Sequence, residues 1–264
     1  MIKKIMTTSL ALLILASAIF LMLPLPGDIS ILMYHFAGSE EESSKSNNTI
    51  TLQSFKTQMK YLRWFRYHVI SMEEYEQIHL KKKAPRGREV VLTFDDGNQS
   101  YFTEFFPVLE SYGYPSTIFL ISESVKHQSN GSMSEEMIKV IMKSPLVTLA
   151  GHTKTHPFLT EVSPDPLKDE VMQSKKDLET MFGRPMDYFS YPFGDFNELV
   201  MKAVQDAGYL LAFTTSPKKL KHLKESLFSI TRIKMGESNK NPVIFLAMTS
   251  GIYQNFKRWR QSLR

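Results

Sequence analysis

The stretch VVLTFDDG, residues 90–97, decides the fold that this sequence predicts. Its apolar, β-branched part is typical of a buried strand, and Gly97 is typical of the turn that ends one. Asp95 and Asp96 stand side by side at that end, where like charges repel and partial burial makes each carboxyl harder to ionise. A metal ion or a catalytic task would offset that cost. A solvated Asp-Gly turn is the alternative.

Strand and helix patterns alternate about seven times along the chain. Strands are expected at 29–35, 67–70, 90–94, 116–121, 146–152, 188–191, 210–215 and 228–235, and helices at 52–65, after Ser71, and at 101–112, 132–144, 167–182, 197–207 and 242–264. Such alternation predicts parallel strands joined by helical crossovers. No Gly-x-Gly-x-x-Gly follows the early strands, so the dinucleotide-binding fingerprint is missing. We therefore predict an α/β fold, a distorted (β/α) barrel of about seven strands, with loops at 38–48 and 81–88.

Composition limits the cofactor and the partners. The 264 residues include no cysteine, so any metal must be held by His, Asp or Glu. The net charge of +5 and the pI near 9.1 favour anionic surroundings such as phospholipid or an acidic cell wall. Nucleic acid is the competing partner, but the chain has no recognisable module for it. We expect a monomer that binds no nucleic acid, with Tyr61, Trp64, Phe65 and Tyr67 packed in its core.

The amino terminus resembles an export signal. Lys3 and Lys4 precede an apolar run over residues 5–25, which is long enough to span a bilayer. Ala16-Ser17-Ala18 is similar to a cleavage site, but large apolar residues at 19–22 continue beyond it and favour an uncleaved anchor. We predict a signal peptide or membrane anchor at 1–26 and one domain at 27–264. That domain would be exported, and either anchored facing outward, secreted or held in the cell wall.

Four of the predicted strands end in residues that carry chemistry, and barrel enzymes place their sites at these carboxyl ends. The ends hold His35, the Asp95-Asp96 pair, His152 with His156, and residues 191–194. Two imidazoles four residues apart can reach one ion, although two surface histidines would give the same spacing. With one carboxylate they would leave coordination positions open on a divalent ion. The second carboxylate could then act as a base on water whose pKa the ion lowers to about 7.

Three segments resemble motifs of a known family. TFDDG at 93–97, HTKTH at 152–156 and SYPFG at 190–194 are similar to the first three motifs of the polysaccharide deacetylases, the NodB-homology domain of carbohydrate esterase family 4. The resemblance extends over roughly residues 35–235. It implies a distorted (β/α) barrel and the metal-dependent removal of N-acetyl groups from N-acetylglucosamine polymers. Zinc is the expected metal, with cobalt or nickel as alternatives.

The resemblance also implies roles for individual residues. Asp95 matches the catalytic base, and Asp96, His152 and His156 match the metal ligands. Tyr191, Pro192 and Phe193 fall in the segment that contacts the oxyanion and substrate, where the backbone N–H of Phe193 would hold the oxyanion. The Tyr191 ring could stack on a sugar or pack half-buried.

The chain departs from the family pattern at two places. Ser190 stands where many members have an arginine, and the late Leu-x-x-His that supplies the general acid is absent, leaving only His222 in a lysine-rich loop. However, residues 32–35 resemble the first strand of the subgroup that acts on poly-β-1,6-N-acetylglucosamine, where a histidine supplies the acid. We therefore predict His35 as the acid, with a core histidine as the alternative. Arg232 could orient Asp95 in place of the missing arginine, or be a surface charge.

Taken together, these features predict a metal-dependent hydrolase that removes N-acetyl groups from a cell-wall or extracellular polysaccharide containing N-acetylglucosamine. Two other functions fit the same motifs. One is a non-catalytic module that binds cell-wall polysaccharide, suggested by the missing late histidine. The other is an O-acetyl esterase, because a bound ion would activate water toward either acyl group.

Overall fold

The fold is described by a computed structural model that covers residues 29–215 and 226–250. The predicted anchor at 1–26, His222 and the end of the helix predicted at 242–264 lie outside these residues. Within the described ranges, no helix combines the length and the apolar character that crossing a membrane requires.

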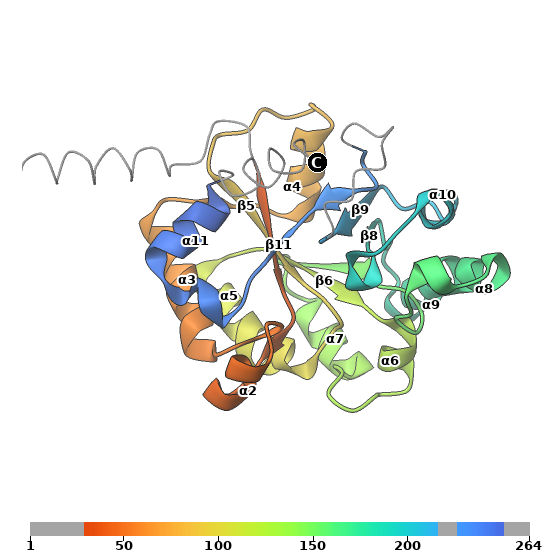
Figure 1. The fold of residues 1–264 in the computed structure, drawn as a ribbon, viewed down its shortest axis with the longest axis horizontal. Coiled ribbons are helices and arrows are strands. Elements are labelled where there is room, and N and C mark those ends of the chain that lie inside the picture. The colour runs from red at the N-terminus through yellow and green to blue at the C-terminus, as the bar shows by residue number, and fades with distance from the viewer. Residues whose placement is uncertain (1–28, 216–225, 251–264) are drawn as a thin grey trace, which may run out of the picture.

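Parallel strands form the centre of the molecule (Figure 1). They follow the order β10-β9-β8-β7-β6-β5-β1-β11, with β4 also paired to β5, and each of these pairings is parallel. The strands are β1 (Ser30–Tyr34), β4 (His68–Val69), β5 (Glu89–Phe94), β6 (Ser116–Leu120), β7 (Val147–Gly151), β8 (Tyr188–Ser190), β9 (Leu211–Thr214), β10 (Ile230–Thr231) and β11 (Ile233–Lys234). The predicted distorted (β/α) barrel is confirmed, with nine strands in the sheet that the described residues form rather than about seven.

Arg232 lies where the two ends of the sheet meet. It separates β10, which pairs with β9, from β11, which pairs with β1. Its backbone N–H donates to the carbonyl of Thr214 at 2.8 Å. The strand predicted at 228–235 is therefore divided between the two edges of the sheet, and this one segment nearly closes the barrel.

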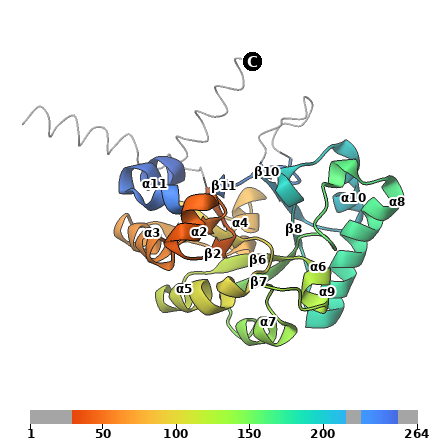
Figure 2. The same cartoon turned by 60° about the horizontal axis from the view of Figure 1, so that its bottom comes forward.

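Helices surround the sheet (Figure 2). They are α2 (Glu40–Lys45), α3 (Leu52–Trp64), α4 (Met72–His79), α5 (Phe106–Tyr112), α6 (Ser122–Lys126), α7 (Glu135–Ile141), α8 (Pro164–Lys168), α9 (Ser174–Phe182), α10 (Glu198–Asp206) and α11 (Pro242–Thr249). Two π-helical segments, η1 (Tyr101–Phe105) and η3 (Asp169–Gln173), lead into α5 and α9. Short 3-10 turns occur at η2 (Leu159–Glu161), η4 (Pro192–Gly194) and η5 (Glu237–Lys240).

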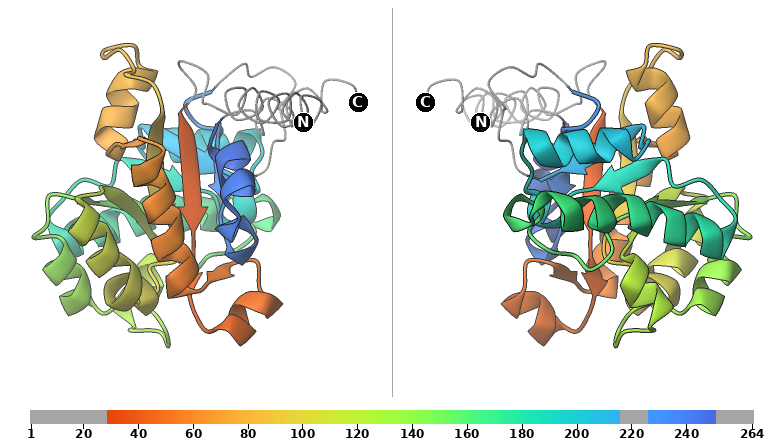
Figure 3. Two further views of the ribbon diagram at one scale, coloured as in Figure 1. Left: turned by 90° about the vertical axis from the view of Figure 1, so that its left-hand side faces the viewer. Right: turned by 90° about the vertical axis from the view of Figure 1, so that its right-hand side faces the viewer.

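Local structure differs from the prediction in three places. The loop expected at 38–48 contains α2, which begins with a capping box between Ser39 and Glu42. The paired two-residue strands β2 (Phe36–Ala37) and β3 (Thr49–Ile50) flank this helix beyond the carboxyl end of β1 (Figure 3). Helix α6 was not predicted. Trp64 is 76% exposed rather than in the core, because it follows buried Leu62 by two residues and so lies on the opposite side of α3 from the packed face.

Aromatic packing fixes the strand ends that carry the site. Tyr34 at the end of β1 stacks on Phe94 at the end of β5 with ring centroids 5.3 Å apart. Phe55 of α3 contacts both rings, at 5.3 Å and 6.1 Å. The Tyr34 hydroxyl donates to Gln58 Oε1 at 2.7 Å, so its one polar group is satisfied inside the core. The residues that follow Tyr34 and Phe94 therefore leave a rigid support.

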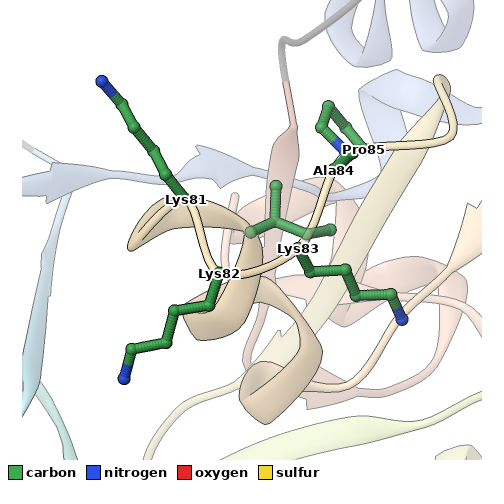
Figure 4. Close-up of a pocket in the computed structure, with 6 residues that line it drawn as sticks. Lys81, Lys82, Lys83, Ala84 and Pro85 are labelled. Atoms are coloured by element: carbon green, nitrogen blue, oxygen red, sulfur yellow. The ribbon is translucent and has the colours of Figure 1, made fainter.

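The opposite end of the barrel carries a different surface. A pocket of about 280 Å³ is lined by Ile78 and residues 81–85, and the side chains of Lys81, Lys82 and Lys83 spread around it (Figure 4). This segment precedes β5, so it lies at the amino ends of the strands. The pocket is therefore separate from the strand ends that hold the candidate site.

Candidate active site

The carboxyl ends of neighbouring strands bring the predicted site residues together. Asp95 and Asp96 follow β5, His152 follows β7, and Ser190 ends β8. These strands are neighbours or near neighbours in the sheet order. Asp96 and Gly97 both adopt left-handed backbone conformations, with φ of 70° and 64°. This turn directs the two adjacent carboxylates to different partners.

Asp96, His152 and His156 form a cluster that fits a divalent cation. One ligand atom from each lies within 4.8 Å of the others. Asp96 Oδ1 is 3.3 Å from His152 Nε2 and 3.5 Å from His156 Nε2. This oxygen is buried without a hydrogen bond of good geometry to any described residue. A buried carboxylate oxygen facing two imidazole nitrogens is the donor set that Zn²⁺ and similar ions take.

The orientation of His152 suits a ligand. Its ring is 2% exposed, and Nδ1 lies 2.7 Å from the carbonyl oxygen of Ser190. A carbonyl only accepts, so Nδ1 carries a proton, and in the neutral form of the ring Nε2 presents a lone pair. Burial lowers the pKa of His152, but the neighbouring carboxylates of Asp96 and Asp95 raise it overall. Burial lowers the pKa of His156 to about 4, so this ring is neutral at pH 7.

The loop that carries both histidines is strained and held by Glu170, which the sequence did not suggest. Thr153 and His156 have positive φ values of 66° and 65°, a conformation that non-glycine residues seldom adopt. Glu170 on η3 accepts from the backbone N–H groups of Lys154 and Thr155 at 3.0 Å and 2.8 Å, and from the Thr155 hydroxyl at 2.6 Å. It is 8% exposed. Strained residues of this kind concentrate at functional sites.

We expect Glu170→Ala to weaken metal binding about 10- to 100-fold, the usual effect of removing a group that orients ligands. The loop between His152 and His156 would lose three hydrogen bonds. Competition with a chromogenic chelator measures the affinity. The neighbouring Asp169→Asn is the control, because Asp169 is exposed and its carboxylate meets the histidine loop through the Lys154 ammonium rather than through the loop backbone. Wild-type affinity in Glu170→Ala would contradict the positioning role.

Asp95 is held by Arg232 in a buried ion pair. The guanidinium donates from Nη1 to Oδ1 at 2.7 Å and from Nη2 to Oδ2 at 2.6 Å. Asp95 is 4% and Arg232 3% exposed, so Arg232 is not a surface charge. Burial raises the pKa of Asp95, but Arg232 and then His152 hold it well below its ordinary value. The carboxylate is therefore ionised at neutral pH.

Ser190 completes this arrangement. It accepts from Arg232 Nη2 at 2.6 Å and lies 3.4 Å from Asp95 Oδ2. The Phe119 ring packs beneath the guanidinium, 5.0 Å from Cζ. A larger side chain at position 190 would compete with Arg232 for this space. The serine that departs from the family motif and the arginine at the barrel seam therefore fit each other.

His35 follows β1 and lies among the same charges. Its Nδ1 is buried without a hydrogen-bond partner among the described residues. Burial lowers its pKa, and Asp95 and Asp96 oppose that effect. Its ring is partly exposed and 5.8 Å from that of Phe36, so it is not a fully packed core residue.

The third motif divides into a packed part and an open part. Tyr191 is 1% exposed, stacks on Phe196 at 4.8 Å and donates its hydroxyl to the Phe228 carbonyl at 2.9 Å. Its ring cannot stack on a sugar here, so of the two alternatives for Tyr191 the structure shows packing, and the ring is fully rather than half buried. Pro192 is buried and has no N–H. Phe193 adopts φ 57° and is 54% exposed, and its backbone N–H donates to no described residue.

The fold and these residues define a parallel (β/α) barrel with a candidate metal site at the carboxyl ends of its strands. Residues 82–212 match the family model for polysaccharide deacetylase, and the chain carries a domain of that family. His35 and Arg232 both lie outside the matched range.

Individual relatives agree with this assignment. YxkH of Bacillus subtilis, assigned to the polysaccharide deacetylases, is 29% identical over 210 residues, covering 80% of this chain and 72% of YxkH. The poly-β-1,6-N-acetyl-D-glucosamine N-deacetylase of Staphylococcus epidermidis is 26% identical over 206 residues, which cover 74% of this chain and 68% of that protein. The Streptococcus pyogenes deacetylase PplD, solved in complex with acetate, superposes with a TM-score of 0.75 at 26% identity, covering 85% of this chain and 99% of PplD.

Proposed function

We propose that this protein is a metal-dependent hydrolase that removes N-acetyl groups from a polysaccharide containing N-acetylglucosamine. The observation that carries the proposal is the meeting of two carboxylates with different environments. Asp96 faces two imidazoles without a hydrogen bond, whereas Asp95 is fixed and ionised by Arg232. Carboxylates held apart in this way are suited to separate roles as ligand and base.

The residues fit a divalent ion, with zinc preferred and cobalt or nickel as alternatives. Asp96, His152 and His156 would hold it. When bound, such an ion supplies Lewis acidity that polarises an acyl oxygen and acidifies water. The ring of His152 is already fixed by the Ser190 carbonyl, so the protein would not have to reorder that ligand.

The remaining residues would handle the protons and the developing charge. Asp95 would take a proton from the attacking water as the water oxygen bonds to the carbonyl carbon of the acetyl group. The backbone N–H of Phe193 would donate to the carbonyl oxygen as it becomes negative. His35 would give a proton to the acetamide nitrogen, so that the C–N bond breaks to release acetate and a free amine.

The relatives support the substrate class. The S. epidermidis protein is named for N-deacetylation of poly-β-1,6-N-acetylglucosamine, and PplD holds acetate, the second product of such a reaction. We further propose that residues 1–26 form a signal or anchor and that residues 27–264 act as an exported monomeric domain. An apolar run after two lysines and a pI near 9.1 support a site at an anionic envelope.

Acetate release from matched N-acetyl and O-acetyl oligosaccharides tests the reaction. The purified full-length chain is incubated with each, and acetate is measured enzymatically. The proposal predicts faster release from N-acetylglucosamine oligomers. Release from the O-acetyl oligomers alone would instead indicate an esterase, and binding without release from either would indicate a carbohydrate-binding module.

We expect His152→Ala to lose the bound metal on desalting, because a buried ligand is replaced by a methyl group. Metal content is measured by inductively coupled plasma mass spectrometry. His127→Ala is the matched control, since His127 is an exposed histidine whose ring pairs with Glu123 on α6. Retention of metal by His152→Ala would show that the ligands are other residues.

A further inference from the structure

Two exposed aromatic rings stand beside the candidate metal ligands. Phe158 and Phe193 stack face to face, with centroids 3.9 Å apart and planes inclined by 13°. The Phe193 ring also meets the His156 ring edge-on, with centroids 4.7 Å apart. Phe158 and Phe193 nevertheless remain 45% and 54% exposed. We call this pair the Phe158–Phe193 stack.

The stack is not explained by core packing. Leu159, next to Phe158, is fully buried, as are Tyr191 and Phe196 around Phe193. The two loops therefore bury these neighbouring apolar side chains and expose the rings of Phe158 and Phe193, of which Phe193 contacts His156. Phe193 also holds a left-handed backbone conformation, which is uncommon for a bulky residue. Exposed apolar patches next to a polar site commonly mark a binding surface.

We propose that the Phe158–Phe193 stack binds a pyranose ring of the polysaccharide, namely the sugar adjacent to the one whose acetamide reaches Asp95 and His35. This inference rests on the proposed function. A pyranose has an apolar face of C–H groups and a rim of hydroxyls, so an aromatic ring can cover the face while the hydroxyls stay in water. Phe193 contacts the His156 ring directly and Phe158 stacks on Phe193. The stack is therefore placed to hold a neighbouring sugar of the same polysaccharide chain.

A subsite of this kind makes the affinity for the substrate depend on the length of the oligosaccharide. An oligomer would contact the stack and the catalytic residues together, whereas a single sugar in the catalytic position would leave the stack uncovered. The contribution of the stack would therefore appear as tighter binding of oligomers. Its loss would raise KM for an oligomer more than it would lower kcat.

The test compares Phe158→Ala and Phe158→Trp with wild type on an N-acetylglucosamine pentamer and on the N-acetylglucosamine monomer, with β-1,6 and β-1,4 linkages in separate arms. For the preferred linkage we expect Phe158→Ala to lower the pentamer-to-monomer ratio of kcat/KM about tenfold, which corresponds to about 1.4 kcal/mol. Phe158→Trp should restore most of this ratio. Trp64→Ala is the control, since it removes an exposed aromatic ring from the far end of α3.

Calorimetric binding of the pentamer to an Asp95→Asn background separates this inference from the proposed function. Weaker binding in Asp95→Asn/Phe158→Ala than in Asp95→Asn supports the stack even if wild type releases no acetate. Equal affinities, or no binding of either pentamer to Asp95→Asn, would overturn it. Absence of acetate release by wild type from all N-acetyl substrates would overturn the proposed function instead.

Discussion

Asp95→Asn is expected to reduce acetate release by about 10²- to 10⁴-fold, the usual contribution of a general base. The amide keeps the size of the carboxylate but cannot accept the proton from water. The three candidate ligands are unchanged in this variant, so metal content should stay at the wild-type level. Acetate release and metal content are measured on the same preparation.

Asp165→Asn is the control for that experiment, because Asp165 is an exposed aspartate on α8. It should match wild type in both measurements. Full activity in Asp95→Asn would mean that another group takes the proton, and the assigned mechanism would be wrong. Loss of metal together with activity would place Asp95 among the ligands.

Arg232→Met is expected to destabilise the fold by about 3–5 kcal/mol, because removing one partner of a buried ion pair leaves an uncompensated charge. Asp95 would keep its carboxylate but lose both guanidinium hydrogen bonds. Activity should fall as well, since the base would no longer be fixed. Urea denaturation of the metal-free proteins measures the free energy of unfolding.

The pair also predicts how this effect changes with pH. The folded-state pKa of Asp95 lies below its unfolded value of about 3.9, so the pair contributes fully above that pH and progressively less as the pH falls. The difference in stability between wild type and Arg232→Met should therefore be largest near neutral pH and shrink below about pH 4. Arg184→Met, at an exposed arginine, should match wild type throughout. A constant difference across this range would argue against the ion pair as its source.

Local sequence was sufficient to predict which site residues lie at the carboxyl ends of the strands. Asp95, Asp96, His152 and His156 sit in short motifs at the ends of predicted strands, and parallel pairing brings such ends to one side of a barrel. The alternation of strands and helices predicted the barrel for the same reason. The roles of these residues stay predictions until the variants are measured.

Long-range geometry decided what the sequence left open. Arg232 meets Asp95 because β10 and β11 pair with opposite edges of the sheet, a closure that no local pattern encodes. Glu170 belongs to no recognisable motif. Its role in holding the histidine loop is seen only from its burial and its hydrogen bonds to that loop. The sequence left the Tyr191 ring open between sugar stacking and packing, and it wrongly placed Trp64 in the core. Periodicity gives the spacing of apolar residues but not which ring faces the core at the end of an element.

The most direct test of the central claim is to titrate zinc into chelator-treated protein while measuring acetate release from N-acetylglucosamine oligomers. The proposed mechanism predicts no release without metal and a rate that rises in proportion to metal bound, with His152→Ala inactive under the same conditions. Undiminished release from protein shown to be free of metal would contradict a metal-dependent mechanism, as would release that is independent of bound zinc, cobalt and nickel.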